Sequence, residues 1–412
     1  MILAQAFARF LLDLDGVVWR GDKPIAGAPE TIRTLRDAGK TVCFMTNNSS
    51  RTAESYAKAL TEMGSPTHPD DVITSADAVA RVLERSVPGM RGRLVLVLGG
   101  EGLRDAVTSV GGRVAEPHEG TDASVVVVGL DRSLTFESLR TATLAIRAGA
   151  TFVASNTDAT FPAPEGLWPG AGALVAALRT STGVEPIVAG KPQTTMLEIA
   201  TERVGGGGAL AVGDRVDTDV AGARAAGWPS ALVLTGVTGI PDLAVAHAWP
   251  DFVIGRLSDL LEDRPHPSVR AIVGADLPHV AGLLHAGGLR SGALRERTGK
   301  TLVAEIDRVV VATAGWEAID DVALLRSVAV SPDARRAGIG RVLVAATLRK
   351  IVAAGIKDVY LVTEHAEAFF AACGFIRIER DVLPDGIASH RQVVQECPID
   401  AATMHLRLPD PQ

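Results

Sequence analysis

Two carboxylates follow the first apolar run of the sequence. In the stretch LLDLDGVVWRGD, residues 11–22, Asp13 and Asp15 stand two positions apart and precede Gly16. Alternate residues of a strand point to the same side, so both acids can reach one cavity where glycine lets the chain turn. Like charges so close are unfavourable unless a cation balances them, and Mg2+ prefers such oxygen ligands. The pair predicts a magnesium site, with two solvated strand-end acids as the alternative.

Polar residues also follow a second apolar run and precede a later helical pattern. Thr46 and Asn47 come after TVCFM, residues 41–45, where a hydroxyl and backbone amides can hold phosphate oxygens. Lys191 stands in Gly-Lys-Pro at the start of a helical pattern, where the helix dipole disfavours a cation, so we expect it to serve an anion. The alternatives are a helix cap at Thr46 and Asn47 and an ordinary surface lysine at position 191.

Further acids follow a third apolar run. In AVGDRVDTD, residues 211–219, Asp214 comes after a glycine, and Asp217 and Asp219 follow it. The alternative is a loop before a helix whose N-terminus favours acids. Each of these motifs has an alternative of this kind. Their ordered set, an acid pair, Thr-Asn, Lys and Gly-Asp, is a stronger signal than any one of them.

The elements that must position these residues alternate along the chain. Apolar runs predict buried strands at residues 10–12, 41–45, 94–98, 125–128, 151–154, 209–212 and 231–234. Amphipathic stretches predict helices at residues 28–38, 53–63, 135–148, 171–180, 194–204 and 220–226. This alternation predicts an α/β fold with a mostly parallel sheet covered on both faces. The loops at the carboxyl ends of the strands would carry the site.

Composition narrows the class of protein. A length of 412 residues predicts two or three domains, and LEDRPHPSV, residues 261–269, is the expected linker. The net charge of -7 argues against nucleic-acid and membrane-surface partners. Three cysteines without zinc-ligand spacing fit a reducing, cytoplasmic compartment. No apolar run reaches the ~18 residues of a membrane span, and the N-terminal segment lacks the cationic start of a signal peptide.

The ordered set resembles the haloacid dehalogenase superfamily of phosphatases. The resemblance covers about residues 1–262 and rests on DLDGVVWRG, FMTNNSSRT, VVVGLDRSLTFESL, ASNTDATFP, PGAGALVAAL, AGKP and VGDRVDTDVAGARAAGW. These details are similar to subfamily IIA, which contains p-nitrophenyl, phosphoglycolate and glycerol-phosphate phosphatases. The resemblance implies a Rossmannoid parallel-sheet core at residues 1–74 and 187–262, with an inserted α/β cap at residues 75–186.

The same resemblance implies roles for the residues that act on phosphate. Asp13 would be the nucleophile that forms an aspartyl-phosphate. Asp15 would protonate the leaving alkoxide and later take a proton from the attacking water. Thr46, the Asn47 backbone and Lys191 would hold and neutralise the transferring phosphoryl group.

A metal site is also implied by the resemblance. Mg2+ would be bound by the Asp13 side chain, the Asp15 backbone carbonyl and Asp214. Asp219 would steady Lys191 or metal-bound water from outside this ligand set. Asp217 is left outside the metal site.

The cap would supply the contacts that select a substrate. Asn156 and Asp158 align with the substrate loop of the family, although Asn and Asp also favour turns. A capped site favours a small phosphorylated metabolite over a phosphoprotein or nucleic acid. The cap loop has no evident cationic cluster for a second anionic group, which favours a neutral polyol tail such as that of glycerol 3-phosphate.

A second region has its own motif. The stretch SVAVSPDARRAGIGR, residues 327–341, is a strand that runs into R-x-x-G-x-G and a helix, a pattern that suits pyrophosphate. Together with LLRSVAVSP and AFFAACGF it resembles the GCN5-related N-acetyltransferase (GNAT) family over residues 268–412. The resemblance implies a mixed α+β domain with an acetyl-CoA loop that includes Arg335, Arg336, Gly338 and Gly340.

Activity of this second region is a separate question. Many members carry a tyrosine as general acid where this sequence has Phe370, and neither Tyr56 nor Tyr360 matches that position. Asp320 and Asp321 are possible bases, with a solvated pair of loop acids as the alternative. Three interpretations stay open: an active acetyltransferase, an acyl-CoA sensor and a structural remnant.

The sequence therefore predicts a Mg2+-dependent phosphatase for a small phosphomonoester, with glycerol 3-phosphate as the preferred candidate. Alternatives are a phosphoglycolate or other metabolite phosphatase, and a bifunctional enzyme that also uses acetyl-CoA. A non-catalytic binding protein is disfavoured because Asp13 and Asp15 are both retained.

Overall fold

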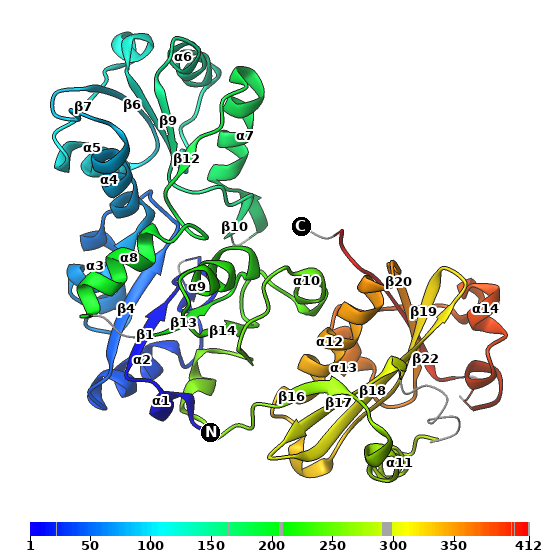
Figure 1. Cartoon of the computed structure of the whole chain (residues 1–412). Coiled ribbons are helices and arrows are strands. Elements are labelled where there is room, and N and C mark those ends of the chain that lie inside the picture. The colour runs from blue at the N-terminus through cyan, green and yellow to red at the C-terminus, as the bar shows by residue number, and fades with distance from the viewer. Residues whose placement is uncertain are drawn as a thin grey trace. The chain divides into compact units, whose positions relative to one another are not determined.

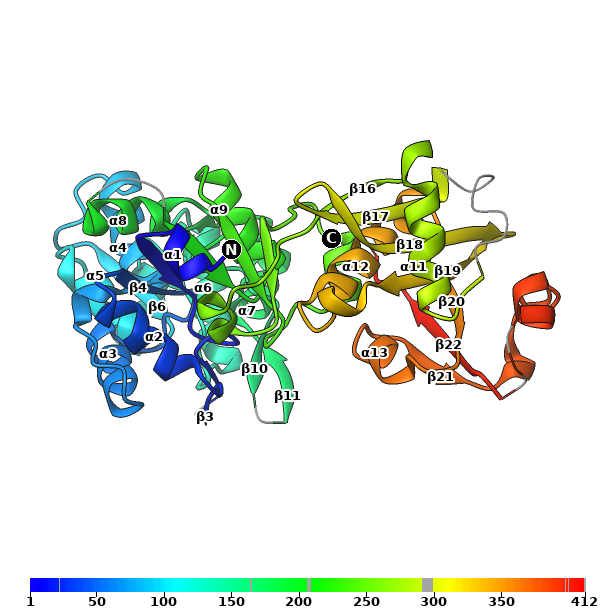
Figure 2. The same cartoon turned by 90° about the horizontal axis from the view of Figure 1, so that it is seen from below.

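The computed structural model describes the chain except for residues 22, 164, 206–208, 291–298, 397, 399 and 411–412. Its contacts divide the chain into two compact units, whose elements are labelled in Figure 1 and seen from below in Figure 2. The first unit contains residues 2–237 and 250–261. The second unit contains residue 1 and residues 238–249 and 262–412.

The first unit is built on a six-stranded parallel sheet in the order β15-β14-β13-β1-β4-β5 (Figure 1). The strands are β1 (Arg9–Leu12), β4 (Thr41–Thr46), β5 (Val72–Thr74), β13 (Leu210–Gly213), β14 (Ser230–Val233) and β15 (Phe252–Ile254). Strand β1 lies between β13 and β4, and Leu12 is in register with Val212 and Phe44. The carboxyl ends of these three strands therefore meet at one edge of the sheet.

Helices cover both faces of this sheet because its strands are apolar on both sides. They are α1 (Leu3–Ala6), α2 (Ala28–Asp37), α3 (Ala53–Glu62), α8 (Thr195–Val204) and α9 (Ala221–Ala225). Phe10, Leu12 and Phe44 pack in one cluster with residues of α2 and α3. Leu11 and Cys43 pack in another cluster, which contains residues of α8. Neighbouring residues thus face opposite layers, as expected of a strand buried on both sides.

A second parallel sheet, in the order β12-β9-β8-β6-β7, forms the cap. Its elements are α4 (Ser75–Ser86), β6 (Leu94–Leu98), α5 (Glu101–Ser109), β7 (Arg113–Val114), β8 (Val125–Val128), α6 (Phe136–Arg147), β9 (Thr151–Ala154), α7 (Ala171–Thr182) and β12 (Ile187–Val188), with the hairpin β10 (Thr160–Ala163) and β11 (Gly166–Pro169). Val97 and Val127 of the cap share a hydrophobic cluster with Leu11 and Cys43 of the core. From the sequence the cap is expected to end at residue 186; strand β12 extends its sheet by two residues.

The second unit contains a seven-stranded mixed sheet in the order β16-β17-β18-β19-β20-β22-β21. Its elements are β16 (Ser268–Ala271), α11 (Leu277–Ala286), β17 (Thr301–Ile306), β18 (Val309–Ile319), β19 (Val322–Val330), α12 (Ile339–Ala353), β20 (Asp358–Thr363), α13 (Glu367–Ala371), β21 (Ile376–Ile378), α14 (Asp385–Ala388) and β22 (Ala402–Arg407). Strands β19 and β20 pair in parallel, and the other neighbouring strands pair antiparallel. Helices α11 and α12 pack in separate hydrophobic clusters with this sheet.

The connection between β14 and β15 belongs to the second unit. Residues 238–249 carry helix α10 (Ile240–Val245), which packs on α12. Arg349 of α12 donates from Nη1 to the Ala246 carbonyl at 2.7 Å, and its guanidinium lies 5.4 Å from the centre of the Trp249 ring. From the sequence these residues are expected in the core at 187–262. In the structure they group with the second unit, in which α10 packs on α12.

The predicted fold class is confirmed. A Rossmann-like parallel-sheet core with an inserted α/β cap is followed along the chain by a mixed-sheet domain. Among the described residues, no helix combines the length and the apolar character that crossing a membrane requires.

Candidate active site

Lys191 joins the acids at the edge of the core sheet. It follows β12 and precedes α8, and its side chain is 2% exposed. Its Nζ atom donates to Oδ1 of Asp13 at 2.6 Å, to Oδ1 of Asp219 at 2.6 Å and to the Met45 carbonyl at 3.1 Å. Burial alone would lower the pKa of Lys191, but the attraction of Asp13 and Asp219 outweighs it and raises the pKa. The ammonium therefore stays charged among buried carboxylates.

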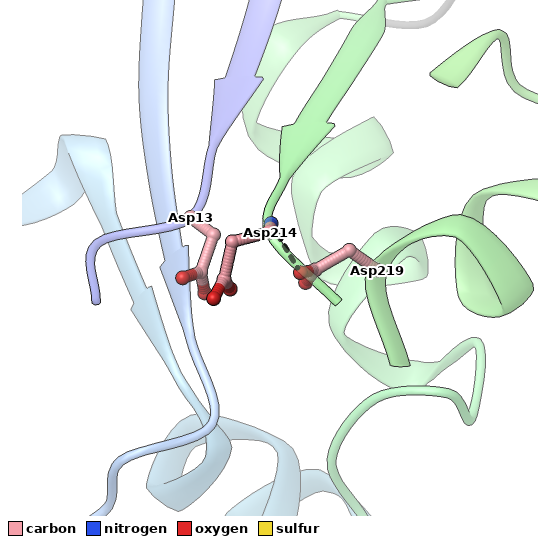
Figure 3. Close-up of side chains that lie close together, drawn as sticks. All are labelled: Asp13, Asp214 and Asp219. Atoms are coloured by element: carbon pink, nitrogen blue, oxygen red, sulfur yellow. Dashed lines mark hydrogen bonds between the residues drawn. The ribbon is translucent and has the colours of Figure 1, made fainter. Parts of the chain in front are cut away.

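Three carboxylates converge at the ends of β1 and β13. The carboxylate groups of Asp13 and Asp214 lie side by side and Asp219 lies next to them, as Figure 3 shows. One oxygen from each of the three lies within 4.8 Å of the others, and all three side chains are buried. Oxygen ligands of this kind, so close together, suit Mg2+ or Ca2+. The donor set therefore fits a hard divalent cation.

The contacts of Asp219 and Asp214 differ. Oδ2 of Asp219 accepts from the backbone amides of Asp214 at 3.1 Å and Arg215 at 3.0 Å, and its other oxygen meets Lys191. Asp219 thus contacts Lys191, and its expected role in steadying Lys191 or metal-bound water stays a prediction. Oδ2 of Asp214 accepts from the Val237 amide at 2.6 Å. Burial, then the nearby Asp219, raises the pKa of Asp214 to about 7.

Asp13 and Asp15 have different surroundings. The Asp13 amide continues the β1–β13 ladder by donating to the Val212 carbonyl at 2.8 Å. Burial raises the pKa of Asp13 well above its usual value, and Lys191 opposes that rise. Asp15 accepts a hydrogen bond from Nε1 of Trp19 at 3.0 Å, and burial raises its pKa too. A carboxyl whose pKa is raised is suited to give and take a proton.

Asn47 connects the core to the cap. Its side-chain oxygen accepts from the Lys191 amide at 2.8 Å, and its Nδ2 donates to the Lys191 carbonyl at 3.0 Å. The same Nδ2 lies 3.0 and 3.2 Å from the two carboxylate oxygens of Asp158 in the cap. Asn156 donates to the Asn47 carbonyl at 2.7 Å. Thr46, buried at the end of β4, accepts from the Asn48 amide at 3.1 Å.

One pocket brings the predicted residues together. Those that line it are Asp13, Asp15, Thr46, Asn47, Asn156, Asp158, Lys191, Asp214 and Asp219. Asp217, which the sequence leaves outside the metal site, forms an ion pair with Arg215 instead. The convergence of these side chains is a geometric fact, and their roles stay predictions.

Several side chains that line the pocket were not named as site residues from the sequence, and Arg215 and Phe161 are among them. Arg215 follows Asp214 directly, and Phe161 projects from β10 of the cap. The ring of Trp168 meets that of Phe161 edge-to-face at 5.9 Å, so Trp168 supports the wall of the pocket. Arg215 could have been noticed as the cation between Asp214 and Asp217. Phe161 lies in ASNTDATFP, the stretch that resembles the family's substrate loop, so the sequence did hold a signal that it lies near the site.

The expected acetyl-CoA loop leads into α12. Gly338 has a φ of +81°, and Arg336 shares this left-handed conformation with a φ of +65°. Nε of Arg335 donates to the Val330 carbonyl at 3.1 Å, and a side chain at Gly340 would lie 3.1 Å from the Phe369 ring. Phe370, which stands where many family members carry a tyrosine, is buried and occupies a packing position.

Family models match both units. A haloacid dehalogenase-like hydrolase model matches residues 10–113, and a HAD-hydrolase-like model matches residues 188–260. A GNAT acetyltransferase domain model matches residues 297–377.

Curated relatives match more than half of the chain. A D-glycerol 3-phosphate phosphatase of Mycobacterium tuberculosis is 44% identical over 245 residues, which are 59% of this chain and 67% of that protein. A 5′-nucleotidase of Bacillus subtilis is 38% identical over 57% of this chain and 90% of its own length. An acid sugar phosphatase of Staphylococcus aureus is 36% identical over 63% of this chain and 98% of its own length.

Solved structures extend the match along the chain. Glycerol phosphate phosphatase from Mycobacterium tuberculosis in complex with magnesium aligns with a TM-score of 0.67 and 31% identity, over 90% of this chain and 98% of that one. A p-nitrophenyl phosphatase from Archaeoglobus fulgidus aligns with a TM-score of 0.57 and 31% identity, over 62% of this chain and 98% of that one. The chain therefore belongs to the haloacid dehalogenase-like hydrolase family, and a GNAT acetyltransferase domain follows the hydrolase region.

Proposed function

We propose that the first unit is a Mg2+-dependent phosphoric monoester hydrolase that acts on a small phosphorylated metabolite, with glycerol 3-phosphate as the preferred substrate. The observation that carries this proposal is the pocket in which Asp13, paired with Lys191, lies beside Asp15 and Asp214. The curated relatives, which include a D-glycerol 3-phosphate phosphatase and acid sugar phosphatases, support it.

Asp13 is the nucleophile of the proposed reaction. One of its carboxylate oxygens attacks phosphorus, and the bond between phosphorus and the ester oxygen breaks to leave an aspartyl-phosphate. Lys191 is held 2.6 Å from Asp13, so its charge is already in place where negative charge is transferred. Thr46 and the backbone of Asn47 lie at the same edge and hold the phosphoryl oxygens.

Asp15 moves the protons. Its protonated form gives a proton to the ester oxygen as the first bond breaks. In the second step a water attacks phosphorus, Asp15 takes the proton of that water, and inorganic phosphate leaves Asp13. The raised pKa of Asp15 keeps a proton available for the first step, and Trp19 fixes the orientation of its carboxyl.

Asp13, Asp214 and the Asp15 carbonyl would hold the Mg2+. A bound divalent ion neutralises the phosphoryl oxygens and the buried acids. The magnesium and calcium complexes of the Mycobacterium tuberculosis glycerol phosphate phosphatase support this choice of metal.

The cap residues favour a polar, uncharged substrate tail. Asp158 lines the pocket and is held there by Asn47, so its carboxylate can accept hydrogen bonds from hydroxyl groups. The same carboxylate repels a second anionic group such as the carboxylate of 2-phosphoglycolate. A glycerol tail satisfies both conditions.

A phosphate-release screen tests the proposal. Glycerol 3-phosphate, 2-phosphoglycolate and p-nitrophenyl phosphate are supplied to the full chain with Mg2+, to an Asp13→Asn variant and to an Asp105→Asn control on the exposed side of α5. We expect the highest kcat/KM with glycerol 3-phosphate, no turnover by Asp13→Asn and normal turnover by the control. Turnover by Asp13→Asn would refute the nucleophile, and a preference for 2-phosphoglycolate would refute the substrate.

Acetyl-CoA binding by the second unit is a separate proposal. The GNAT match and the left-handed residues that lead into α12 support it. Calorimetric titration of the full chain with acetyl-CoA tests it. We expect wild type to give heat of binding and an Arg336→Ala variant to lose it. If wild type gives no heat, acetyl-CoA binding is refuted and the structural-remnant interpretation is left.

A further inference from the structure

Arg215 forms an ion pair with Asp217 that uses two of its three guanidinium nitrogens. Nε and Nη2 donate to the two carboxylate oxygens of Asp217 at 3.1 and 2.7 Å. The Arg215 side chain is 14% exposed, whereas that of Asp217 is 40% exposed. This paired geometry fixes the plane of the guanidinium, because both groups are planar and the two bonds are parallel.

The remaining nitrogen of Arg215 reaches the cap. Nη1 donates to the Thr160 carbonyl at 3.3 Å. Thr160 begins strand β10, and the next residue, Phe161, lines the pocket. Arg215 itself lies next to Asp214 in the core. A single side chain therefore joins the loop that carries a candidate metal ligand to the cap segment over the pocket.

The same cap segment is tied to the core a second time. Asp158, two residues before Thr160, accepts hydrogen bonds from Asn47. Burial raises the pKa of Asp158, and the charge of Arg215 is the largest influence that opposes this rise. Asn47 and Arg215 thus hold residues 158–160 from two points, and both favour the charged form of Asp158.

We propose that Arg215 is a positioning residue that closes cap residues 158–160 over the site, with Asp158 directed at the polar tail of the substrate. This inference rests on the proposed function, because it concerns how that site selects its substrate. Arg215 acts through the cap segment and Asp217 fixes Arg215. The effect is on the binding of a hydroxylated tail and not on the phosphoryl-transfer step.

Steady-state kinetics of Arg215 variants test this. Arg215→Ala, Arg215→Lys and Asp217→Asn are compared with wild type on glycerol 3-phosphate and on p-nitrophenyl phosphate, which has no hydroxyl tail. The control is Arg81→Ala, which removes a similar pair, with Glu202 at 2.9 and 2.7 Å, outside the residues that line the pocket. Thermal unfolding of every variant checks that it is folded.

For Arg215→Ala we expect KM for glycerol 3-phosphate to rise about tenfold, as for loss of one charge-assisted contact, with kcat within about threefold of wild type. KM for p-nitrophenyl phosphate changes less. Lysine keeps the charge without the paired geometry, so Arg215→Lys recovers part of the loss, and Asp217→Asn shows a smaller loss. In an Asp158→Asn background, Arg215→Ala has little further effect.

Three outcomes overturn the proposal. An unchanged KM for glycerol 3-phosphate shows that the cap segment does not need Arg215. An equal loss of kcat/KM on both substrates shows that Arg215 contacts the phosphoryl group directly. A loss shared by Arg81→Ala shows a general effect of removing an arginine pair. If wild type hydrolyses neither substrate, the proposed function fails; if wild type is active and Arg215→Ala matches it, the positioning role alone fails.

Discussion

Nζ of Lys191 lies 2.6 Å from Oδ1 of Asp13, and the lysine side chain is almost fully buried. The same ammonium lies 2.6 Å from Asp219. A buried ammonium is costly unless it is paired, and two buried carboxylates are costly unless a cation lies between them. The pair with Asp13 is therefore a structural necessity, and its part in catalysis is a prediction.

Replacing Lys191 should harm both stability and turnover. Lys191→Met removes the charge and keeps a similar length, so Asp13 and Asp219 lose their cation. We expect the free energy of unfolding to fall by ~3–5 kcal/mol and kcat to fall by at least about a hundredfold. Urea unfolding and phosphate release measure the two effects. Lys58→Met, at a side chain that is 77% exposed, is the control, and a kcat near wild type for Lys191→Met would contradict the role.

Removing the metal should abolish activity reversibly. Asp13 and Asp214 are held with one oxygen of each within 4.8 Å of the other, which favours a divalent ion. We expect EDTA to stop phosphate release and added Mg2+ to restore it. Mg2+ should also raise the thermal midpoint of wild type, because a ligand that binds the folded state stabilises it. Asp214→Asn should lose most of this rise, and full activity in EDTA would exclude a metal.

The charge of Asp158 should make substrate binding depend on pH. Burial raises the pKa of Asp158 from 3.8 to about 6, so the carboxylate that we propose accepts hydroxyl hydrogen bonds becomes the main form as the pH rises through 6. We expect KM for glycerol 3-phosphate to fall as pH rises from 5 to 7. Asp158→Asn should lose this change. Because phosphomonoesters titrate with a pKa of about 6, the comparison uses the ratio of the two proteins' KM values at each pH.

The titration of Asp158 should lower the stability of the fold as pH rises, although it should improve substrate binding. The folded state holds the Asp158 proton up to a pKa of about 6, and the unfolded chain releases it near 3.8. The free energy of unfolding contributed by this group therefore falls as pH rises from about 4 to about 6. Relative to wild type, Asp158→Asn should gain ~1–2 kcal/mol between these limits. Urea unfolding at both ends of the range measures it, and a constant difference would show an ordinary pKa.

The main residues of the site could be predicted from the sequence because each lies next to a recognisable strand or helix. Asp13, Thr46 and Asp214 each follow an apolar strand, and the carboxyl ends of neighbouring parallel strands must meet. Lys191 was placed by its unfavourable position at a helix start. The structure brings these side chains to one pocket, as the strand order requires.

Contacts that depend on how separate segments pack could not be predicted. The bond from Arg215 to Thr160 exists only because the cap folds over the core. No helix was expected at residues 238–249, and nothing in their sequence indicates that α10 packs on α12. Periodicity shows which side of an element is apolar, but it does not identify the surface that covers that side.

Gly16 should not tolerate a side chain, and a comparison with Gly39 can separate the two causes, backbone strain and collision with neighbouring atoms. Gly16 has a φ of +82°, and an added Cβ would lie 2.5 Å from Oδ2 of Asp214 and 2.9 Å from the Cα of Gly236. Gly39 has a φ of +72°, and no described atom lies within 4 Å of its added Cβ. Alanine at either position incurs ~1–2 kcal/mol of left-handed backbone strain.

Gly16→Ala and Gly39→Ala therefore differ in the collision of the added Cβ with Asp214 and Gly236, which only Gly16→Ala causes. We expect Gly16→Ala and Gly39→Ala to be destabilised by that strain, and Gly16→Ala by more. Because Asp214 must move, Gly16→Ala should also raise the Mg2+ concentration for half-maximal activity about tenfold, which corresponds to ~1.4 kcal/mol. Mg2+ titrations of phosphate release measure this. Equal Mg2+ requirements in the two variants would show that the close approach of Gly16 does not orient Asp214.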